Sequence, residues 1–268
     1  MKILHLIKRI FRIIFRNIII DKSGKINKLT TNNIIMSFNI RADHPRDIEH
    51  NWIHRKEAIL KMIEDIKPAI ICMQEVQPHM FKYLVNALSD TYNNISRMRT
   101  TYKEINKSFK WFEGGLVIFY DKSKYDVVNC KLHKFLDTNG KPHSYNYLDA
   151  LFLNKDKMFM TLVINNHMSL TKNIREKDIE ILKTILYNNS YTAYACGDFN
   201  CSSKSTEFKP LNEYYITPDV ERTFNHFDNT YAVIDYIISN TKISGYKVIN
   251  QDYGVPYISD HYPIIINL

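Results

Sequence analysis

The sequence is poor in the residues that build several common kinds of site. Its 268 residues include only four cysteines, with no CxxC pair and no zinc-ligand spacing. A disulfide framework and a structural zinc site are therefore not expected. Cys72 and Cys196 lie in apolar, strand-like segments, which is typical of small buried side chains. This cysteine usage favours a reduced, intracellular setting, either cytoplasmic or at the periphery of a membrane.

Glycine is also scarce, at seven residues, and no glycine-rich phosphate-binding loop occurs. No serine or cysteine occupies a nucleophile elbow between a strand and a helix. The chain contains no internal repeat and no linker rich in proline or glycine. Because length sets only a soft limit on domain number, these absences predict one domain, residues 32–268, behind an extension formed by residues 1–31. We expect the protein to be a monomer.

The first twenty residues lack acidic side chains and lack a long apolar run. Their charge-free stretches are far shorter than the roughly 20 apolar residues that span a bilayer. The basic residues there are Lys2, Lys8, Arg9, Arg12 and Arg16. Most of them fall on one side of a helix, opposite Ile, Leu and Phe, which is typical of a basic amphipathic helix on a membrane surface. An organelle-targeting presequence and a helix packed on its own domain are the alternatives.

The whole chain carries a net charge of +8, with a pI of about 9.1. A basic surplus favours polyanionic partners such as nucleic acid, anionic lipid or phosphate esters. Five of the eight net charges lie in residues 1–20. The surplus is therefore local, and it is only a weak indication of the partner.

Short apolar runs and amphipathic runs alternate along the rest of the chain. Strands are expected over residues 32–40, 69–76, 115–120, 126–135, 149–154, 159–167, 191–196, 231–239, 246–250 and 262–268. Helices are expected over 52–66, where Pro68 ends the helix, and over 79–88 and 174–187. Several strands are apolar on both faces and need cover on both sides. The expected fold is α/β, with two packed sheets and helices outside them.

Chemically capable side chains recur where these strands end. The residues in question are Asn39, Glu75, His167, Asp198, Asn200, Asp235, Asp260 and His261. The segment "GDFN" (197–200) alone would be an ordinary turn, since Gly, Asp and Asn favour turns. Asp235 stands within the apolar run "VIDYII", where an acid is costly unless it has a partner. Six strands that end in this way predict one shared rim.

The chemistry of this set points to one reaction class. Glu75, Asp198 and Asp260 supply hard oxygen ligands suited to Mg²⁺ or Mn²⁺. His261 is a candidate general base or acid, and a carboxylate such as Asp235 can orient it. Asn200 and His167 can donate hydrogen bonds to charge that builds on a phosphoryl oxygen. Together they predict metal-assisted hydrolysis of a phosphoester.

The motifs "NI" (39–40), "QE" (74–75), "NNH" (165–167), "GDFN" (197–200), "IDYI" (234–237) and "SDHYP" (259–263) occur in an order that resembles the endonuclease/exonuclease/phosphatase superfamily. The resemblance implies a DNase I-like four-layer α/β sandwich, in which two mainly antiparallel sheets are flanked by helices.

The resemblance also implies a role for each strand-end residue. Glu75 looks like the principal metal ligand, with Asn39 beside it and Asp260 helping to hold the metal or its water. Asp198 looks like the acid that aligns or deprotonates the attacking water. Asn200 and His167 are similar to groups that contact the substrate phosphate. His261 resembles the essential histidine, with Asp235 as its partner.

One departure and one narrower resemblance concern the start of the domain. Many members carry a carboxylate two residues after the first asparagine, where this chain has Arg41. The pair Trp52 and Arg55 resembles a W-x-x-R signature found in one subgroup of these hydrolases.

Among substrates, the basic charge favours nucleic acid, which makes a nuclease or another phosphodiesterase the first expectation. The alternative is a membrane-associated phosphoesterase acting on lipid, inositol phosphate or nucleotide. A non-catalytic binding module is least favoured, because the site residues are intact.

Overall fold

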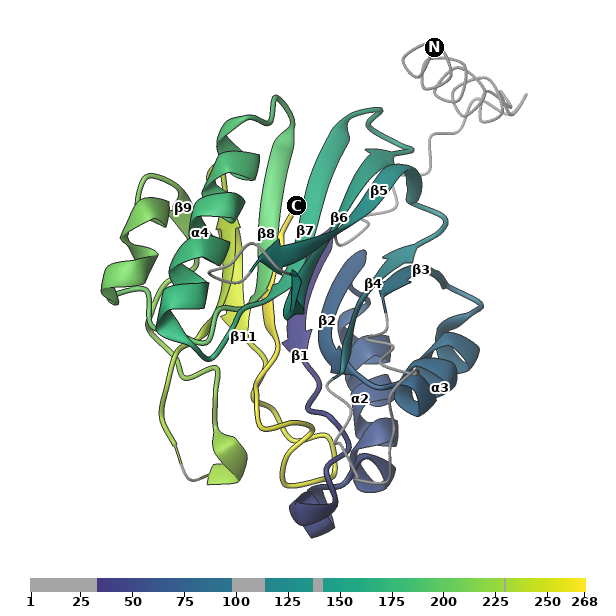
Figure 1. Cartoon of the computed structure of the whole chain (residues 1–268). Helices are drawn as coiled ribbons and strands as arrows, with labels where there is room; N and C mark the ends of the chain where they lie inside the picture. The colour runs from purple at the N-terminus through teal and green to yellow at the C-terminus, as the bar shows by residue number, and fades with distance from the viewer. Residues whose placement is uncertain (1–32, 98–113, 137–141, 229) are drawn as a thin grey trace, which may run out of the picture.

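The computed structural model describes residues 33–97, 114–136, 142–228 and 230–268, which form two six-stranded sheets packed face to face (Figure 1). In spatial order, the first sheet contains β11 (Ser244–Val248), β12 (Ile264–Asn267), β1 (Ile34–Asn39), β2 (Ile70–Val76), β4 (Gly115–Asp121) and β3 (Tyr92–Arg97). The second contains β5 (Tyr125–Leu136), β6 (Pro142–Asn154), β7 (Met160–His167), β8 (Thr192–Asp198), β10 (Asp235–Ser239) and β9 (Tyr215–Ile216).

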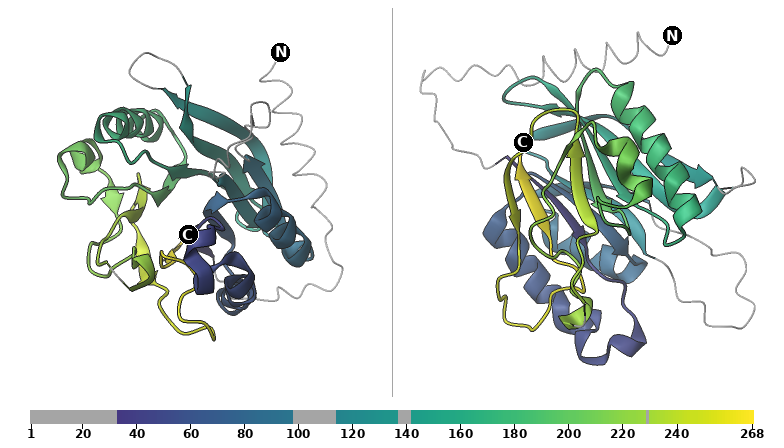
Figure 2. Two further views of the ribbon diagram at one scale, coloured as in Figure 1. Left: turned by 60° about the horizontal axis from the view of Figure 1, so that its bottom comes forward. Right: turned by 90° about the vertical axis from the view of Figure 1, so that its left-hand side faces the viewer.

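Helices cover the outer face of each sheet. The first sheet is covered by α2 (Trp52–Ile66) and α3 (Pro78–Leu88), and the second by α4 (Lys172–Tyr187), as the two views of Figure 2 show. Within the described ranges, three short 3₁₀ helices lie in the connections: η1 (Pro45–His50), η2 (Thr206–Leu211) and η3 (His226–Asp228). Lys67 ends α2 in a left-handed conformation directly before Pro68, as the sequence predicts. The pairs β1–β2 and β7–β8 are parallel and the other described pairs are antiparallel, so the predicted α/β sandwich is confirmed.

Three apolar layers hold the sandwich together, and the alternation of side chains along the strands explains them. Along β1, Ile35 faces the opposite sheet while Met36 packs under α2 and α3. Along β2, Cys72 and Met73 divide in the same way. Because both faces of these strands are buried, the sequence shows continuous apolar runs rather than alternation with polar residues. The third layer lies between α4 and the second sheet.

Some expected element bounds were wrong. The strand expected over 231–239 begins only at Asp235, because Ala232 pairs with Phe224 outside the sheet. Asp235 therefore stands at the first residue of β10 rather than inside a strand. The strand expected over 191–196 runs on to Asp198, which puts Gly197 inside β8. The short strand β9 and the edge strand β3, which contains "YNNIS", were not expected, because β9 has only two residues and the asparagines of β3 disfavour a strand. Both form by pairing with a neighbouring strand.

The predicted extension, residues 1–31, and its amphipathic helix lie outside the described residues. Within the described ranges, no helix combines the length and apolar character needed to cross a lipid bilayer.

Candidate active site

The pairing of three strands places three predicted site residues in one row. His167 is the partner of Asp198 across the parallel β7–β8 pair, and Asp235 is the partner of Asp198 across the antiparallel β8–β10 pair. The chain approaches itself closely here. A Cβ atom on Gly197 would lie 2.0 Å from the carbonyl oxygen of Asn166, so this position requires glycine because of space rather than a turn.

Glu75 reaches the site from the end of β2, where the strand is irregular. The β2–β4 register shifts between Met73 and Val76, and Glu75 has a φ of +62°, which is unusual for a residue with a side chain. A Cβ atom on Gly114 would lie 1.9 Å from the Glu75 carbonyl carbon, so only glycine fits opposite it. Backbone strain of this kind often occurs at functional sites.

Asn39 links the two sheets beneath the site. Its amide nitrogen donates hydrogen bonds to Glu75 Oε1 and Asp198 Oδ2, both at 3.1 Å. Its amide oxygen accepts from the backbone N–H of Arg41 at 3.0 Å, and because an N–H can only donate, this contact fixes the orientation of the amide. Asn39 thus lies beside Glu75 as expected, and it presents its nitrogen, not an oxygen ligand, to the carboxylates.

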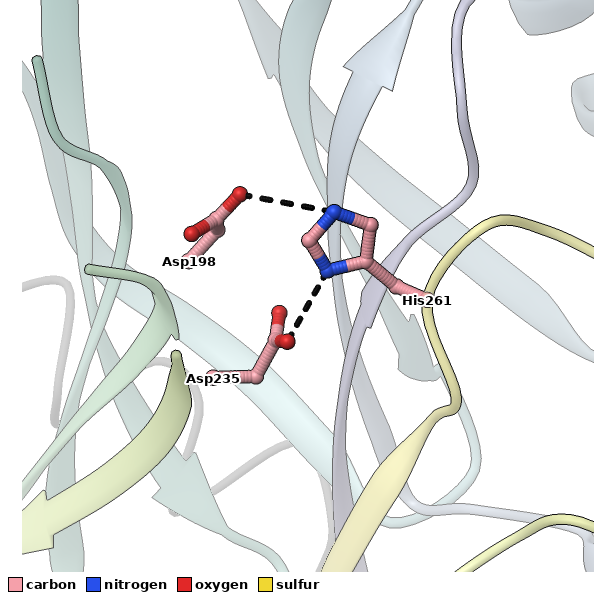
Figure 3. A group of neighbouring side chains, drawn as sticks. All are labelled: Asp198, Asp235 and His261. Atoms are coloured by element: carbon pink, nitrogen blue, oxygen red, sulfur yellow. Dashed lines mark hydrogen bonds and ion pairs between the residues drawn. The ribbon is translucent and has the colours of Figure 1, made fainter. Parts of the chain in front are cut away.

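His261 is buried between carboxylates, as Figure 3 shows. Its Nδ1 lies 2.9 Å from Asp235 Oδ2, and its Nε2 lies 3.7 Å from Asp198 Oδ2. Burial alone would lower the pKa of His261, but Asp235, Asp198 and Asp260 together raise it to about 10. The imidazole is therefore protonated at neutral pH, held by Asp235 as the sequence predicts.

Asp198 lies at the centre of the cluster. Its Oδ1 accepts the backbone N–H of Asn200 at 2.8 Å, while His167 Nε2 lies 3.6 Å from its Oδ2. Burial raises the pKa of Asp198 to about 7, and the charges of Asp235 and Glu75 act in the same direction. A carboxylate with a pKa in this range is well suited to accept a proton from water near neutral pH.

Asn200 and His167 lie on the same side of Asp198. Asn200 has a φ of +52°, and its Nδ2 donates to the backbone oxygen of Met168 at 2.8 Å. That bond ties the "GDFN" segment to the chain just after His167. Both side chains line the same cavity as Asp198, so either can meet a ligand there.

Glu75 and Asp260 are the candidate oxygen ligands for a metal ion in this cavity. Burial alone would raise the pKa of Glu75, but His167, the backbone N–H of Ala42 and Arg41 lower it to about 2, so the carboxylate is ionised. Burial raises the pKa of Asp260, opposed by His261 and the nearby arginines. An ionised carboxylate beside a second buried one fits a hard divalent cation such as Mg²⁺.

A second group of potential ligands is less suited to a metal. Atoms of Asp198, Asp235 and His261 lie within 4.8 Å of one another, which is close enough for one ion. However, His261 already shares its Nδ1 with Asp235, and a protonated imidazole offers no lone pair to a metal. This group is better suited to handling protons.

The cavity that these residues surround has a volume of about 410 Å³. Six of the eight predicted residues line it: Glu75, His167, Asp198, Asn200, Asp260 and His261. The other two, Asn39 and Asp235, lie behind the lining and each holds a lining residue through a hydrogen bond. The sequence-based set thus converges on one cavity, in two shells.

Arg55 is a site residue whose role sequence reasoning missed. This buried guanidinium donates to the backbone oxygens of Ile40, Ile258, Arg41 and His50 at 2.6–3.1 Å. Burial lowers its pKa to about 10. It thereby ties the segment after β1 to the segment that leads into Asp260. The signal is present in the sequence, because Arg55 stands on the apolar face of its helix, in line with Ala58, Ile59 and Met62.

A four-layer sandwich with this cluster at its strand ends is the DNase I-like fold. The chain belongs to the Endonuclease/Exonuclease/phosphatase family, whose model matches residues 36–261. It is a phosphoesterase of that superfamily, as the sequence motifs predict. No curated protein sequence matches the chain.

Solved structures agree with the fold. An endonuclease/exonuclease/phosphatase from Bacteroides vulgatus superposes with a TM-score of 0.74 at 23% identity, covering 88% of this chain and 98% of that one. A mannosyl-6-phosphatase from Bacteroides thetaiotaomicron gives a TM-score of 0.74 at 22% identity over the same shares. The human Nocturnin catalytic domain, with bound sulfate, gives 0.68 at 18% identity, covering 88% and 92%. At these identities the likeness supports the fold alone.

Proposed function

We propose that the protein is a divalent-metal-dependent phosphoester hydrolase that uses a water nucleophile. The observation that carries the proposal is the convergence of Glu75, Asp198, Asp260 and His261 on one cavity. A bound Mg²⁺ or Mn²⁺ would polarise the phosphoryl group and lower the pKa of a water molecule. Glu75 and Asp260 are the residues that would hold the ion, and Asn39 orients Glu75.

The remaining residues have distinct proposed roles. Asp198 accepts the proton of the attacking water, for which its raised pKa suits it. His261, kept protonated by Asp235, faces the negative charge that grows on the phosphoryl group. Asn200 and His167 bind phosphoryl oxygens from the other side of Asp198. In this scheme His261 acts as a cation or an acid, and the base is Asp198.

For the substrate, the charge of the domain favours a small phosphoester. Residues 1–32 carry eight lysines and arginines against one aspartate, which leaves 28 basic and 27 acidic residues in 33–268. The domain is therefore almost balanced, whereas proteins that track nucleic acid rely on a basic surface. A cavity of about 410 Å³ is also within the range of small-molecule sites.

Two alternatives use the basic N-terminal residues. These residues favour binding to an anionic membrane, where the enzyme would act on lipid or soluble phosphoesters. They equally favour binding to a nucleic acid, where the enzyme would act as a nuclease or phosphodiesterase. The non-catalytic binding module remains the weakest alternative, because nothing in such a role requires the metal and proton residues to be kept together.

The test is a phosphoester panel that includes sugar phosphates, nucleotides, inositol phosphates, DNA and RNA. We expect hydrolysis with Mg²⁺ or Mn²⁺, none with EDTA, and a loss of at least about 100-fold in Glu75→Gln and His261→Gln. Glu64→Gln and His54→Gln, at exposed positions of α2, serve as matched controls and should keep full activity. Full activity in both site variants would contradict the assignment of Glu75 and His261 to the active site. Ligand binding without any hydrolysis would support the binding module instead.

A further inference from the structure

Arg41 reverses the charge that the family resemblance leads one to expect at its position. It lies two residues after Asn39, where many members carry a carboxylate. Its side chain nevertheless lines the same cavity as Glu75, Asp198 and His261. The cavity therefore contains a fixed cation that the proposed hydrolysis does not itself require.

The guanidinium is held by Asp47 and also contacts Asp260 in the lining of the cavity. Its Nε and Nη2 pair with the two carboxylate oxygens of Asp47 at 2.8 and 3.0 Å. Its remaining nitrogen, Nη1, lies 3.3 Å from Asp260 Oδ2. The Arg41 side chain is 27% exposed, against 8% for Asp47 and 4% for Asp260. Of these three groups, the Arg41 side chain is the most exposed, and it lines the cavity.

The backbone of Arg41 is fixed as well. Its φ of +56° is an uncommon conformation for a residue with a long side chain. Its N–H donates to Asn39 Oδ1, and its carbonyl oxygen accepts from Arg55 Nη2 at 3.1 Å. A group held in place before the ligand arrives loses little conformational freedom on binding.

The positive charge and the hydrogen-bond donors around the cavity suit one class of phosphoester. Beside a metal ion, His167 and Asn200, Arg41 supplies a further cationic donor. A phosphodiester offers two non-bridging oxygens and one charge. A phosphomonoester near neutral pH carries close to two charges on three terminal oxygens. A guanidinium is a strong partner for such a group, because its hydrogen bonds to an anion are charge-assisted.

We propose that Arg41 binds the terminal phosphate of the substrate through Nη1 and makes the site selective for phosphomonoesters over phosphodiesters. The proposal rests on the proposed hydrolysis at the same site. It names the substrate class of that site: a small molecule that carries a terminal phosphate.

The experiment compares p-nitrophenyl phosphate with bis(p-nitrophenyl) phosphate, which share a leaving group, using the full chain with Mn²⁺. In Arg41→Gln, kcat/KM for the monoester should fall about 10- to 100-fold, and that for the diester less than about 3-fold. Arg41→Lys should restore part of the loss. Arg46→Gln, which removes an exposed neighbouring arginine, should leave both values unchanged.

A binding measurement separates this proposal from the hydrolysis itself. Inorganic phosphate should bind the Mn²⁺-loaded wild-type chain about 10-fold or more tighter than the Arg41→Gln variant, while the affinity for Mn²⁺ stays within about 3-fold. Equal losses on both esters, or unchanged phosphate affinity, would overturn the role of Arg41. The wild-type chain could hydrolyse no phosphoester while the Arg41→Gln variant binds phosphate more weakly than wild type. In that case the proposed hydrolysis is wrong and the phosphate-binding role of Arg41 stands.

Discussion

At the scale of single residues, the charge of His261 depends on its neighbours more than on its own chemistry. Burial would favour the neutral ring, yet Asp235 at 2.9 Å, with Asp198 and Asp260, keeps it protonated by raising its pKa to about 10. Because the pKa is higher in the folded chain than in the unfolded one, protonation stabilises the fold. This contribution is complete below about pH 6.5 and is lost as the pH rises through about 10.

Asp235→Asn should therefore destabilise the protein in a pH-dependent way. Without metal, in EDTA, we expect a loss of about 3 kcal/mol in the free energy of unfolding at pH 6, because a buried charged pair is broken. The difference from wild type should narrow as the pH approaches 10. Urea unfolding at a series of pH values measures it, with His54→Gln as the control. A difference that stays constant from pH 6 to pH 9.5 would contradict the pairing.

The identities of the site residues could be predicted from the sequence, but several orientations could not. Glu75 and Asp198 lie at the ends of apolar strands and His261 lies just before one, so the sequence predicts that they meet at one rim. The direction of the Asn39 amide depends on the N–H of Arg41, which no pattern of residues reveals. The contact of Arg41 with Asp260 and the four carbonyl partners of Arg55 likewise arise only when distant segments fold together.

At the scale of elements, strand ends set the geometry of the site, and α2 locks two of them together. Core strands such as β1 and β2 were predictable because both of their faces are apolar. The edge strands were not predictable: β3 contains several polar residues and β9 has only two residues, and both form because a neighbouring strand offers hydrogen bonds. The start of β10 at Asp235 was missed for a related reason, since Phe224 draws the preceding residues away from the sheet.

Arg55→Lys tests the connection that α2 makes. A lysine keeps the charge but cannot serve four carbonyl oxygens at once, so the free energy of unfolding should fall by about 2 kcal/mol. Because the carbonyls belong to the segments beside Asn39 and Asp260, the dissociation constant for Mn²⁺ should rise about 10-fold. Titration calorimetry well below the unfolding temperature measures it. Lys61→Met, on the exposed side of α2, is the control. An unchanged Mn²⁺ affinity in the folded Arg55→Lys variant would show that Arg55 contributes to packing alone and does not position the metal ligands.

At the scale of the whole molecule, the surplus of positive charge and the candidate catalytic residues are separated along the chain. Residues 1–32 contain most of the surplus, whereas 33–268 are nearly balanced and contain the complete set of site residues. In the proposed function, charge on the N-terminal residues would affect where the enzyme acts, while the cavity would determine what it hydrolyses. The two questions can be separated by experiment, because charge in the first segment can be changed without substituting any of the proposed site residues.

The full chain carrying Lys8→Glu, Arg12→Glu and Arg16→Glu tests membrane binding separately from hydrolysis. Each basic residue near an anionic membrane contributes about 1 kcal/mol, so we expect binding to vesicles of phosphatidylserine and phosphatidylcholine to weaken about 100-fold or more. Co-sedimentation measures it, and pure phosphatidylcholine vesicles give the background. Hydrolysis of a soluble phosphomonoester should stay at the wild-type rate, because the proposed site residues all lie between Asn39 and His261 in the sequence and none of them is substituted. Unchanged sedimentation of the variant would contradict the membrane hypothesis.

If RNA or DNA binding falls in parallel with a loss of nucleic-acid cleavage, the same three charges support the nuclease instead.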